Sequence, residues 1–431
     1  MDVAPLLGAG SLWAATAAPA PDLPALEGEI RCDVAVIGGG FTGLSTGLHL
    51  AERGVSVAVL EAGPIGDGAS GRNGGQVIPG LKKDAAALDG IFGKGWGERL
   101  TLLADGAAQR VYDIVARYAI DCGLERNGWV RAAHAERALE DVATLGRQLQ
   151  DRGQDAVMLS RAEIAAMLGT DIYVGGMHDR RAGAVQPLSY VRGLARAAAS
   201  AGAKVFQNSP AVSLVAASSG WKVETARGTI LAEQVVLATG AYSGRLWPAL
   251  SRSFVGVQSA QLASAPLSDN LRAVVNPSRA VVSDTRKLAN YFRVDATGRL
   301  IVGGRGPLSD SPAPATLEAI ERAARRWFPE LGQVDWRHAW CGRIDITLDS
   351  LPRVTRPAPG LWTALGYNGR GVALATTMGA VLANKLSGGD DPLLDWPETP
   401  LSTIPFHGLR APGVAAATAW YRLRDALGFA G

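Results

Sequence analysis

Cysteine and histidine are scarce in this chain, and neither is clustered. The 431 residues include three cysteines, Cys32, Cys122 and Cys341, which form no close pair, and five histidines without a metal-binding spacing. A disulfide framework or a metal site of cysteines and histidines needs pairs or clusters of these residues. We therefore predict no disulfide and no metal, and the odd cysteine count favours a reducing, cytoplasmic location.

Long apolar runs and concentrated charge are also missing. No uninterrupted run of about 18 apolar residues occurs, so no membrane span is predicted. The net charge is only +3 and the basic residues are dispersed, which argues against a nucleic-acid partner. Residues 1–30 lack a basic start and are interrupted by glycines and prolines, so we expect an N-terminal arm rather than a secretion signal.

Glycine is abundant, and one glycine-rich stretch organises the rest of the chain. Val34–Ile37 is an apolar, β-branched run typical of a buried parallel strand, and Gly38, Gly40 and Gly43 follow it as G-x-G-x-x-G. Such glycines permit a tight turn, the close approach of a pyrophosphate and close packing of the next helix, whose N-terminal N–H groups bind phosphate. We predict that helix over residues 41–53.

A second strand and an acidic residue complete the pattern. Residues 55–60 are apolar, and Glu61 follows them, 18 positions beyond Gly43, where a carboxylate can hold the ribose hydroxyls of a dinucleotide. Three glycines alone would also fit an ordinary turn in an α/β domain. Because strand, glycines, helix, strand and acid occur in register, the sequence favours a dinucleotide site.

The segment behind this acid indicates which dinucleotide binds. Residues 66–76 read GDGASGRNGGQ, and small residues here leave room for an extended FAD, whereas a nicotinamide enzyme would normally begin its next helix. With this segment the chain resembles the D-amino-acid oxidase superfamily of FAD enzymes, in particular its γ-glutamylputrescine oxidase-like branch. The resemblance implies FAD contacts at Gly38, Gly40, Phe41, Thr42, Gly43, Glu61, Ala62, Ala69, Ser70, Arg72, Asn73, Gly74, Gly75, Gln76, Val212, Thr239 and Gly240.

The same resemblance implies the architecture. We expect an α/β fold in which a Rossmann-like FAD-binding domain is combined with a discontinuous α+β substrate domain that contains an antiparallel sheet. We assign residues 31–90, 160–245 and 336–431 to the FAD-binding domain, and residues 91–159 and 246–335 to the substrate domain.

Periodicity places the main elements of the middle of the chain. Residues 95–119, 135–152 and 315–328 show apolar residues at helical spacing and are predicted as amphipathic helices. Residues 233–243 read EQVVLATGAYS, a strand that ends in the Ala-Thr-Gly turn expected beneath the nucleotide. Four β-rich runs between turn residues predict an antiparallel sheet over the flavin ring: residues 255–265, 279–283, 288–294 and 299–304.

The last third resembles the part of the superfamily that returns over the flavin. Residues 338–352 read HAWCGRIDITLDSLP, and the tail carries Tyr-x-Leu-Arg-Asp at residues 421–425. A helix that begins after a second glycine turn would aim its positive end at the flavin N1 and C2 carbonyl, although a tight turn without an electrostatic role is the alternative. The implied contacts there are Gly366, Gly369, Arg370, Gly371 and Val372.

Two departures from the superfamily pattern narrow the expectation. In sarcosine oxidase-like relatives a lysine after the second glycine turn holds the substrate carboxylate, but Ala373 occupies that position. This favours amines whose carboxylate is distant or absent. Relatives that bind flavin covalently use a cysteine one position later than Cys341, or a histidine where Arg72 and Asn73 occur. We therefore expect non-covalent FAD.

The implied reaction is oxidation of a carbon beside an amine nitrogen. Hydride transfer to flavin gives an imine, water hydrolyses the imine to a carbonyl compound, and molecular oxygen or another acceptor reoxidises the flavin. An amino-acid dehydrogenase that reduces a quinone and a non-catalytic flavin-binding subunit are the alternatives. Aromatic walls exclude water and an arginine binds a carboxylate, so the candidate substrate contacts are Tyr291, Arg293, Trp340 and Arg343.

Overall fold

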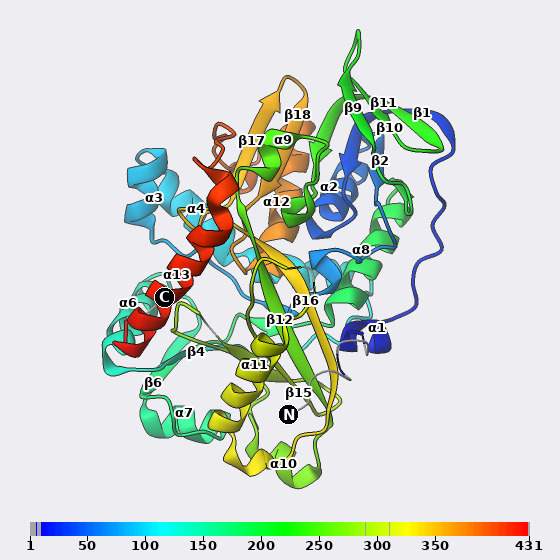
Figure 1. The fold of residues 1–431 in the computed structure, drawn as a ribbon. Helices are drawn as coiled ribbons and strands as arrows, with labels where there is room; N and C mark the ends of the chain where they lie inside the picture. Colours follow the sequence, from blue (N-terminus) through cyan, green and yellow to red (C-terminus); the bar gives the residue numbers. More distant parts are fainter. Residues whose placement is uncertain (1–5, 7–9, 289, 310, 430–431) are drawn as a thin grey trace.

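Two large sheets form the framework of the molecule. The computed structural model describes residue 6 and residues 10–288, 290–309 and 311–429. The first sheet lies in the upper part of Figure 1 and the second in the lower part. Parallel and antiparallel strands combined with helices confirm the predicted α/β fold class.

The first sheet is mainly parallel and follows the order β17, β18, β11, β1, β2, β8. Its central strands β1 (Gly28–Ile37), β2 (Val57–Leu60) and β11 (Gly228–Leu237) contain the apolar runs expected of strands that are covered on both faces. The other members are β8 (Lys204–Phe206), β17 (Arg353–Ala358) and β18 (Leu361–Leu365), and the hairpin β9 (Ser213–Ala216) and β10 (Trp221–Glu224) pairs with β11.

Three helices form one packed layer beside this sheet: α2 (Phe41–Ala51), α8 (Pro187–Ser200) and α12 (Gly371–Leu386). Helices α2 and α12 approach closely, because a Cβ at Gly379 would lie only 2.4 Å from the Cβ of Ser45. Small residues on α12 therefore allow the second glycine turn to lie beside the first.

The second sheet follows the order β16, β12, β15, β14, β13, β4, β6, β5. All neighbouring strands in it are antiparallel except β13 and β4, which are parallel. Helix α11 (Pro314–Trp327) packs against β12 and β15. The strands are β4 (Trp129–Ala133), β5 (Ala156–Leu159), β6 (Gly175–Asp179), β12 (Val255–Pro266), β13 (Val281–Asp284), β14 (Tyr291–Val294), β15 (Arg299–Arg305) and β16 (Trp336–Ile346).

The remaining elements connect or cover the sheets. A short two-stranded sheet joins β3 (Gln76–Val77) to β7 (Gly183–Ala184). The other helices are α1 (Leu12–Thr16), α3 (Ala85–Phe92), α4 (Trp96–Asp105), α5 (Ala107–Arg117), α6 (Glu136–Asp151), α7 (Arg161–Leu168), α9 (Pro248–Ser251), α10 (Asp269–Val274) and α13 (Arg410–Ala426).

The structure differs from the sequence-based expectations at two places. The helix predicted over residues 95–119 is two helices, α4 and α5, because the chain turns at Gly106 between them. The second sheet also includes β6 and β16, although residues 160–245 and 336–431 were assigned to the FAD-binding domain. Strand β16 belongs there because it pairs with β12 from Val255 opposite Ile346 to Ser264 opposite Trp336.

The N-terminal arm packs on the folded body through α1. Trp13 is 1% exposed, and its indole N–H donates a hydrogen bond of 2.8 Å to the carbonyl of Asn73. The ring of Trp13 also meets Trp340 edge-on, with 5.6 Å between ring centroids. The arm therefore touches both the loop after β2 and the second sheet.

Within the described ranges, no helix is long and apolar enough to cross a membrane, and no group of three or more potential metal ligands occurs. The three cysteines are buried and unpaired with one another.

Candidate active site

At the glycine turn after β1, backbone segments pack closely against one another. Gly38 has a φ of +113°, and a Cβ there would lie 2.6 Å from the carbonyl oxygen of Ala238. A Cβ at Gly43 would lie 1.9 Å from the carbonyl oxygen of Gly38. These positions accept only glycine, since any side chain would force the turn, the strand β11 end or α2 apart.

The loop after β2 supports the start of α2. The N–H of Phe41 donates a hydrogen bond of 2.9 Å to the hydroxyl of Ser70, and a Cβ at Gly40 would lie 2.8 Å from that same oxygen. Asn73 holds the loop itself, because its amide donates to the carbonyls of Ala69 and Ser70 and its oxygen accepts from the N–H of Gly75. The GASGRNGGQ segment is thus fixed against the first glycine turn.

Glu61 is held at the end of β2 by backbone N–H groups. Its carboxylate accepts hydrogen bonds from Gly39 at 2.8 Å and from Gly63 at 3.2 Å. Burial raises the pKa of Glu61 more than these hydrogen bonds lower it. Its carboxylate therefore lies on the cavity wall in the position expected of a ribose ligand.

The second glycine turn precedes α12 and is fixed by Asp345. The carboxylate of Asp345 accepts a 2.7 Å hydrogen bond from the N–H of Gly366, and burial raises the pKa of this acid to about 6. Arg370, at the N-cap of α12, donates instead to the carbonyls of Pro79 and Leu81, so no side chain caps the first N–H groups of the helix. These groups remain available to a ligand.

A cavity of about 1350 Å³ lies between the two glycine turns and the second sheet. Most of the predicted contacts line it, drawn from segments that are far apart in the sequence. On its wall are Gly38, Gly40, Phe41, Thr42, Glu61, Ala62, Ala69, Ser70, Arg72, Asn73, Gly74, Gln76, Thr239, Gly240, Tyr291, Arg343, Gly369, Arg370, Gly371 and Val372.

Some predicted cofactor contacts lie outside this wall. Gly43, Gly75 and Gly366 shape the backbone behind it through the contacts described above, or, for Gly75, through the approach of the Val185 carbonyl. Val212 is 65% exposed just before the β9–β10 hairpin, and the cavity is lined by residues 209–211 instead.

Two predicted substrate contacts, Arg293 and Trp340, also lie away from the cavity. Arg293 donates a 2.9 Å hydrogen bond to the carbonyl of Val185 and faces the ring of Trp13 at 5.1 Å. The indole N–H of Trp340 donates to the carbonyl of Arg72 at 3.0 Å. Both side chains are engaged in packing the arm and the flavin loop onto the second sheet.

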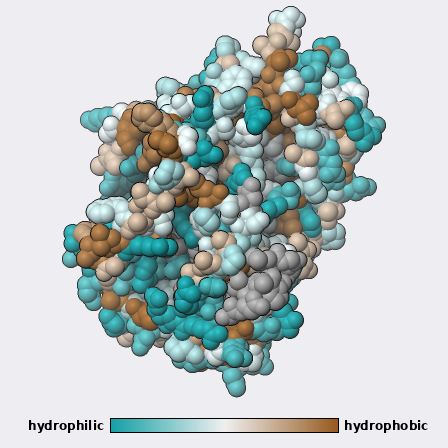
Figure 2. All heavy atoms as spheres, in the orientation of Figure 1, coloured by the Kyte–Doolittle hydropathy of each residue, from teal (hydrophilic) through white to brown (hydrophobic). Residues whose placement is uncertain are grey.

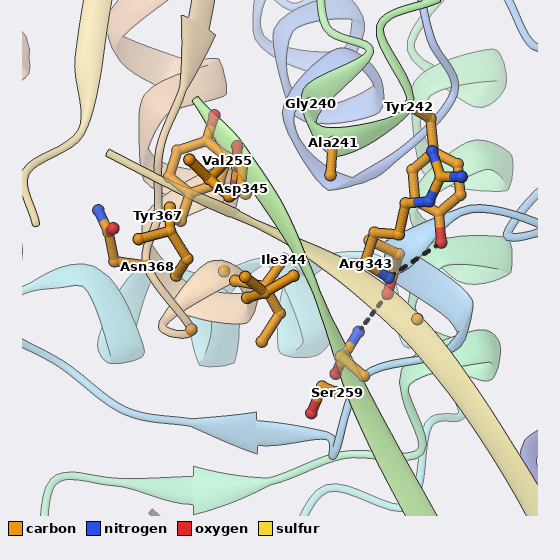
Figure 3. A pocket seen from close by; sticks show the side chains of 18 of the residues that line it. Gly240, Ala241, Tyr242, Val255, Ser259, Arg343, Ile344, Asp345, Tyr367 and Asn368 are labelled. Atoms are coloured by element: carbon orange, nitrogen blue, oxygen red, sulfur yellow. Dashed lines mark hydrogen bonds between the residues drawn. The ribbon is translucent and has the colours of Figure 1, made fainter. Parts of the chain in front are cut away.

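The other two substrate candidates are on the wall. The hydroxyl of Tyr291 lies 2.8 Å from that of Ser259. Figure 3 shows Arg343 reaching from β16 toward Tyr242, whose ring lies 5.6 Å from the guanidinium and whose hydroxyl accepts from the Arg343 N–H at 3.2 Å. Tyr291 therefore faces the cavity from β14, and Arg343 is stacked at its edge.

Sequence reasoning missed a set of basic side chains on the same wall: Lys82, Arg131, Lys287 and Arg305. They come from four separate segments, so no local motif marks them. It also missed the pair of Thr42 and Tyr367, whose hydroxyls meet at 2.6 Å and join α2 to the second glycine turn.

The residues present fit FAD. Gly38 and Gly40 line the cavity at the start of α2 without side chains, as the close approach of a diphosphate to a helix N-terminus requires. Gln76 lines the cavity with a buried side-chain amide that has no hydrogen-bond partner in the described part of the chain. A cofactor that offers acceptors at this place would satisfy it.

Comparison with known proteins identifies the family of the chain. A model of the family described as "DAO: FAD dependent oxidoreductase" matches residues 33–385. The chain is 33% identical to a probable oxidoreductase OrdL of Haemophilus influenzae, in an alignment that covers 91% of this chain and 89% of that protein. It is 31% identical to the gamma-glutamylputrescine oxidoreductase of Escherichia coli, covering 97% of this chain and 98% of that protein.

The fold agrees as well. The structure of glycine oxidase from Geobacillus kaustophilus matches with a TM-score of 0.73 at 24% identity, covering 87% of this chain and 99% of that chain. The resemblance found in the sequence and the predicted FAD cofactor are thereby confirmed. The chain belongs to the DAO family and is an FAD-dependent amine or amino-acid oxidoreductase.

Proposed function

We propose that this protein oxidises the C–N bond of a primary or secondary amine of the γ-glutamylputrescine type, with non-covalent FAD. The observation that carries the proposal is a continuous cavity of about 1350 Å³ that joins a dinucleotide cradle to a wall of the second sheet. The gamma-glutamylputrescine oxidoreductase of Escherichia coli, similar over nearly the whole chain, supports this substrate class.

The absence of a carboxylate-binding lysine after the second glycine turn also supports this substrate class. Ala373, which replaces the lysine of sarcosine oxidase-like relatives, is fully buried and does not line the cavity. Beside the second glycine turn there is thus no lysine at this position for a carboxylate next to the reacting amine. This arrangement favours a substrate whose acidic group, if it has one, is remote from the oxidised carbon.

Bound FAD would supply the redox chemistry by accepting a hydride from the carbon beside nitrogen. The chain's own residues bind and orient the reactants. The uncapped N-terminus of α12 places N–H groups and positive dipole charge at Gly371 and Val372, where negative charge on a reduced cofactor would be stabilised. Tyr291 lines the cavity from β14, where an aromatic side chain would help to exclude water.

Non-covalent attachment is supported by the place of Cys341. Its side chain is buried and does not line the main cavity, but a small adjoining recess whose wall shares Arg72 and Tyr242 with that cavity. Burial of this kind is typical of a structural cysteine. In the proposed cycle, water hydrolyses the imine and molecular oxygen accepts the electrons. A cytoplasmic location stays our prediction from cysteine usage.

The test is anaerobic mixing of the purified yellow protein with γ-glutamylated amines, polyamines and N-methyl amino acids. We expect at least one γ-glutamylated amine to bleach the flavin absorption, and air to restore it. Restoration by a quinone but not by air would favour the dehydrogenase alternative. If a chemical reductant bleaches the flavin and no amine does, the proposal fails and a non-catalytic flavin-binding role gains support.

A further inference from the structure

One end of the cavity carries several positive charges. Lys82 follows β3, Arg131 lies on β4, Lys287 follows β13 and Arg305 ends β15, and all four line the cavity. The positive charges of Arg131, Lys287 and Arg305 act together on Lys82, whose pKa they help to lower. The four residues therefore form one electrostatic cluster, although they are far apart in the sequence.

Part of the cluster is not neutralised by the protein, although the carboxylate of Asp141 acts on Arg131 and that of Asp425 acts on Lys287. Neither Lys82 nor Arg305 has a hydrogen-bond or ion-pair partner among the residues that the structure describes. The carboxylate of Asp284, which also lines the cavity, forms an ion pair with the guanidinium of Arg286, with 2.6 Å between nitrogen and oxygen. The guanidinium of Arg370 donates hydrogen bonds to the backbone carbonyls of Pro79 and Leu81.

Unpaired cations inside a cavity cost free energy. Desolvation and the neighbouring positive charges lower the pKa of Lys82 to about 7, and desolvation also lowers the pKa of Lys287 and Arg305. An anionic group placed among them would form charge-assisted hydrogen bonds and relieve this repulsion. The site is therefore complementary to a ligand anion.

The diphosphate of FAD is not that anion. Its cradle is the turn at Gly38–Phe41, at the end of β1 in the first sheet. The cations instead come from β4, β15 and the segments after β3 and β13, on the side of the second sheet. An anionic group of a second ligand that shares the cavity would therefore complement these cations.

We propose that Lys82, Lys287 and Arg305 form a subsite for a carboxylate that the substrate carries at the end away from its oxidised C–N bond. The proposal rests on the proposed amine oxidation and specifies its substrate class. It separates carboxylated amines from simple polyamines, which lack the anion and bring additional positive charge to a cationic wall.

Binding can be tested without turnover. Calorimetry on the FAD-loaded protein would compare a series of α,ω-dicarboxylates, malonate to suberate, with their neutral diamides. The double variant Lys82→Met/Arg305→Met is compared with Lys94→Met/Arg299→Met, in which an exposed lysine and an arginine of the same strand β15 are changed outside the cavity wall. FAD content is measured in each protein.

We expect at least one dicarboxylate to bind the native and control proteins, and to bind the double variant about ten- to a hundredfold more weakly. Binding should also weaken as pH rises through 7 in the native protein, because Lys82 loses its proton, and this dependence should diminish in Lys82→Met. Asp284, which lines the same cavity, has a pKa raised to about 6, so the difference between the two profiles is the readout. The charged groups that act on Lys82 are Arg131, Lys287, Arg305 and Arg370, and Arg424 and Asp425 act on the neighbouring Lys287.

No binding of any dicarboxylate, or equal affinity in native protein and double variant, would overturn the subsite. Flavin reduction then separates the two proposals. If ω-amino acids and matched alkylamines reduce the flavin equally well, the subsite is wrong while amine oxidation holds. If dicarboxylates bind as expected but no amine reduces the flavin, the subsite holds and the proposed function is wrong.

Discussion

The two ends of the cavity recognise their ligands in different ways. At the first-sheet end the wall is backbone: Gly38 and Gly40 line the cavity, Gly43 packs behind them, and none of the three leaves room for a side chain. At the second-sheet end the wall is made of side chains, among them Tyr291 and Arg305, which meet the cavity from β14 and β15. The first end fits one cofactor by shape, and the second fits a class of substrates by charge and size.

This difference predicts which substitutions the molecule tolerates. A change at the glycine end must displace backbone or the supporting Ser70, so it should remove the cofactor. A change at the cationic end removes a group without protein partners, so it should leave fold and cofactor intact and alter substrate preference. The following variants test this contrast, from the largest expected effect to the smallest.

Gly40→Val should remove FAD. The added Cβ would lie 2.8 Å from the Ser70 hydroxyl, beside the first N–H of α2, and the loss in FAD affinity should be about tenfold or more. The measurement is the ratio of flavin to protein absorption after gel filtration. Gly90→Val is the matched control, because a Cβ there meets no atom within 4 Å. Full FAD content in Gly40→Val would contradict the assigned cradle.

Trp13→Ala should destabilise both ends together, because this residue contacts Asn73 in the flavin loop and Trp340 in the second sheet. Loss of a fully buried tryptophan typically costs about 3–5 kcal/mol in the free energy of unfolding, which urea denaturation would measure. Trp420→Ala changes a tryptophan that is 58% exposed and should have little effect. Equal stability of the two variants would show that the arm does not support the cavity.

Asp425→Ala should affect only the substrate end. Helix α13 crosses the left side of Figure 1, has no buried residue among those described, and lines the cavity through Ala417 and Tyr421. Asp425 anchors it by accepting hydrogen bonds from the N–H groups of Lys287 and Leu288. Figure 2 shows exposed apolar residues along this face, and Trp420 and Leu423 of α13 are among the exposed ones.

In Asp425→Ala we expect the KM of the amine to rise by about tenfold or more, with unchanged FAD content, since charge-assisted anchors of this kind contribute about 1.5–3 kcal/mol. Steady-state kinetics with the best amine would measure it, and Arg422→Ala, an exposed change on the same helix, is the control. Loss of FAD without a change in KM would place α13 at the wrong end of the cavity.

Cys341→Ala should have the smallest effect. Because this thiol lies outside the main cavity, acid precipitation should release all the FAD from native protein and variant alike. Yellow colour that stays in the native pellet and disappears from the Cys341→Ala pellet would show a covalent bond.

The same contrast explains how far the sequence could predict the site. The glycine end is contiguous: strand, turn, helix start and acid fall within residues 34–61, so spacing alone revealed it. The cationic end is assembled by the second sheet from residues such as Lys82 and Arg305, which no local pattern connects. The strand pairing that assembles this end was not predictable from strand propensity, because β16 pairs with β12, which lies far away in the sequence.

The incorrectly placed substrate candidates have a physical cause. Arg293 and Trp340 lie on the strands that were expected near the cavity, but Trp13 from the arm packs against both of them. Position along a strand, rather than the strand itself, decides whether a side chain reaches the cavity. The N-terminal arm covers these two side chains through contacts between distant parts of the chain. Its docking was therefore not predictable from local sequence patterns.

A crystal structure of the FAD-loaded protein with a bound dicarboxylate would test the account most directly. We predict the FAD diphosphate on the Gly38–Phe41 turn, the flavin ring against the N-terminus of α12, and the carboxylate between Lys82 and Arg305. A flavin ring turned away from α12, or a cavity filled by a different nucleotide, would contradict the account.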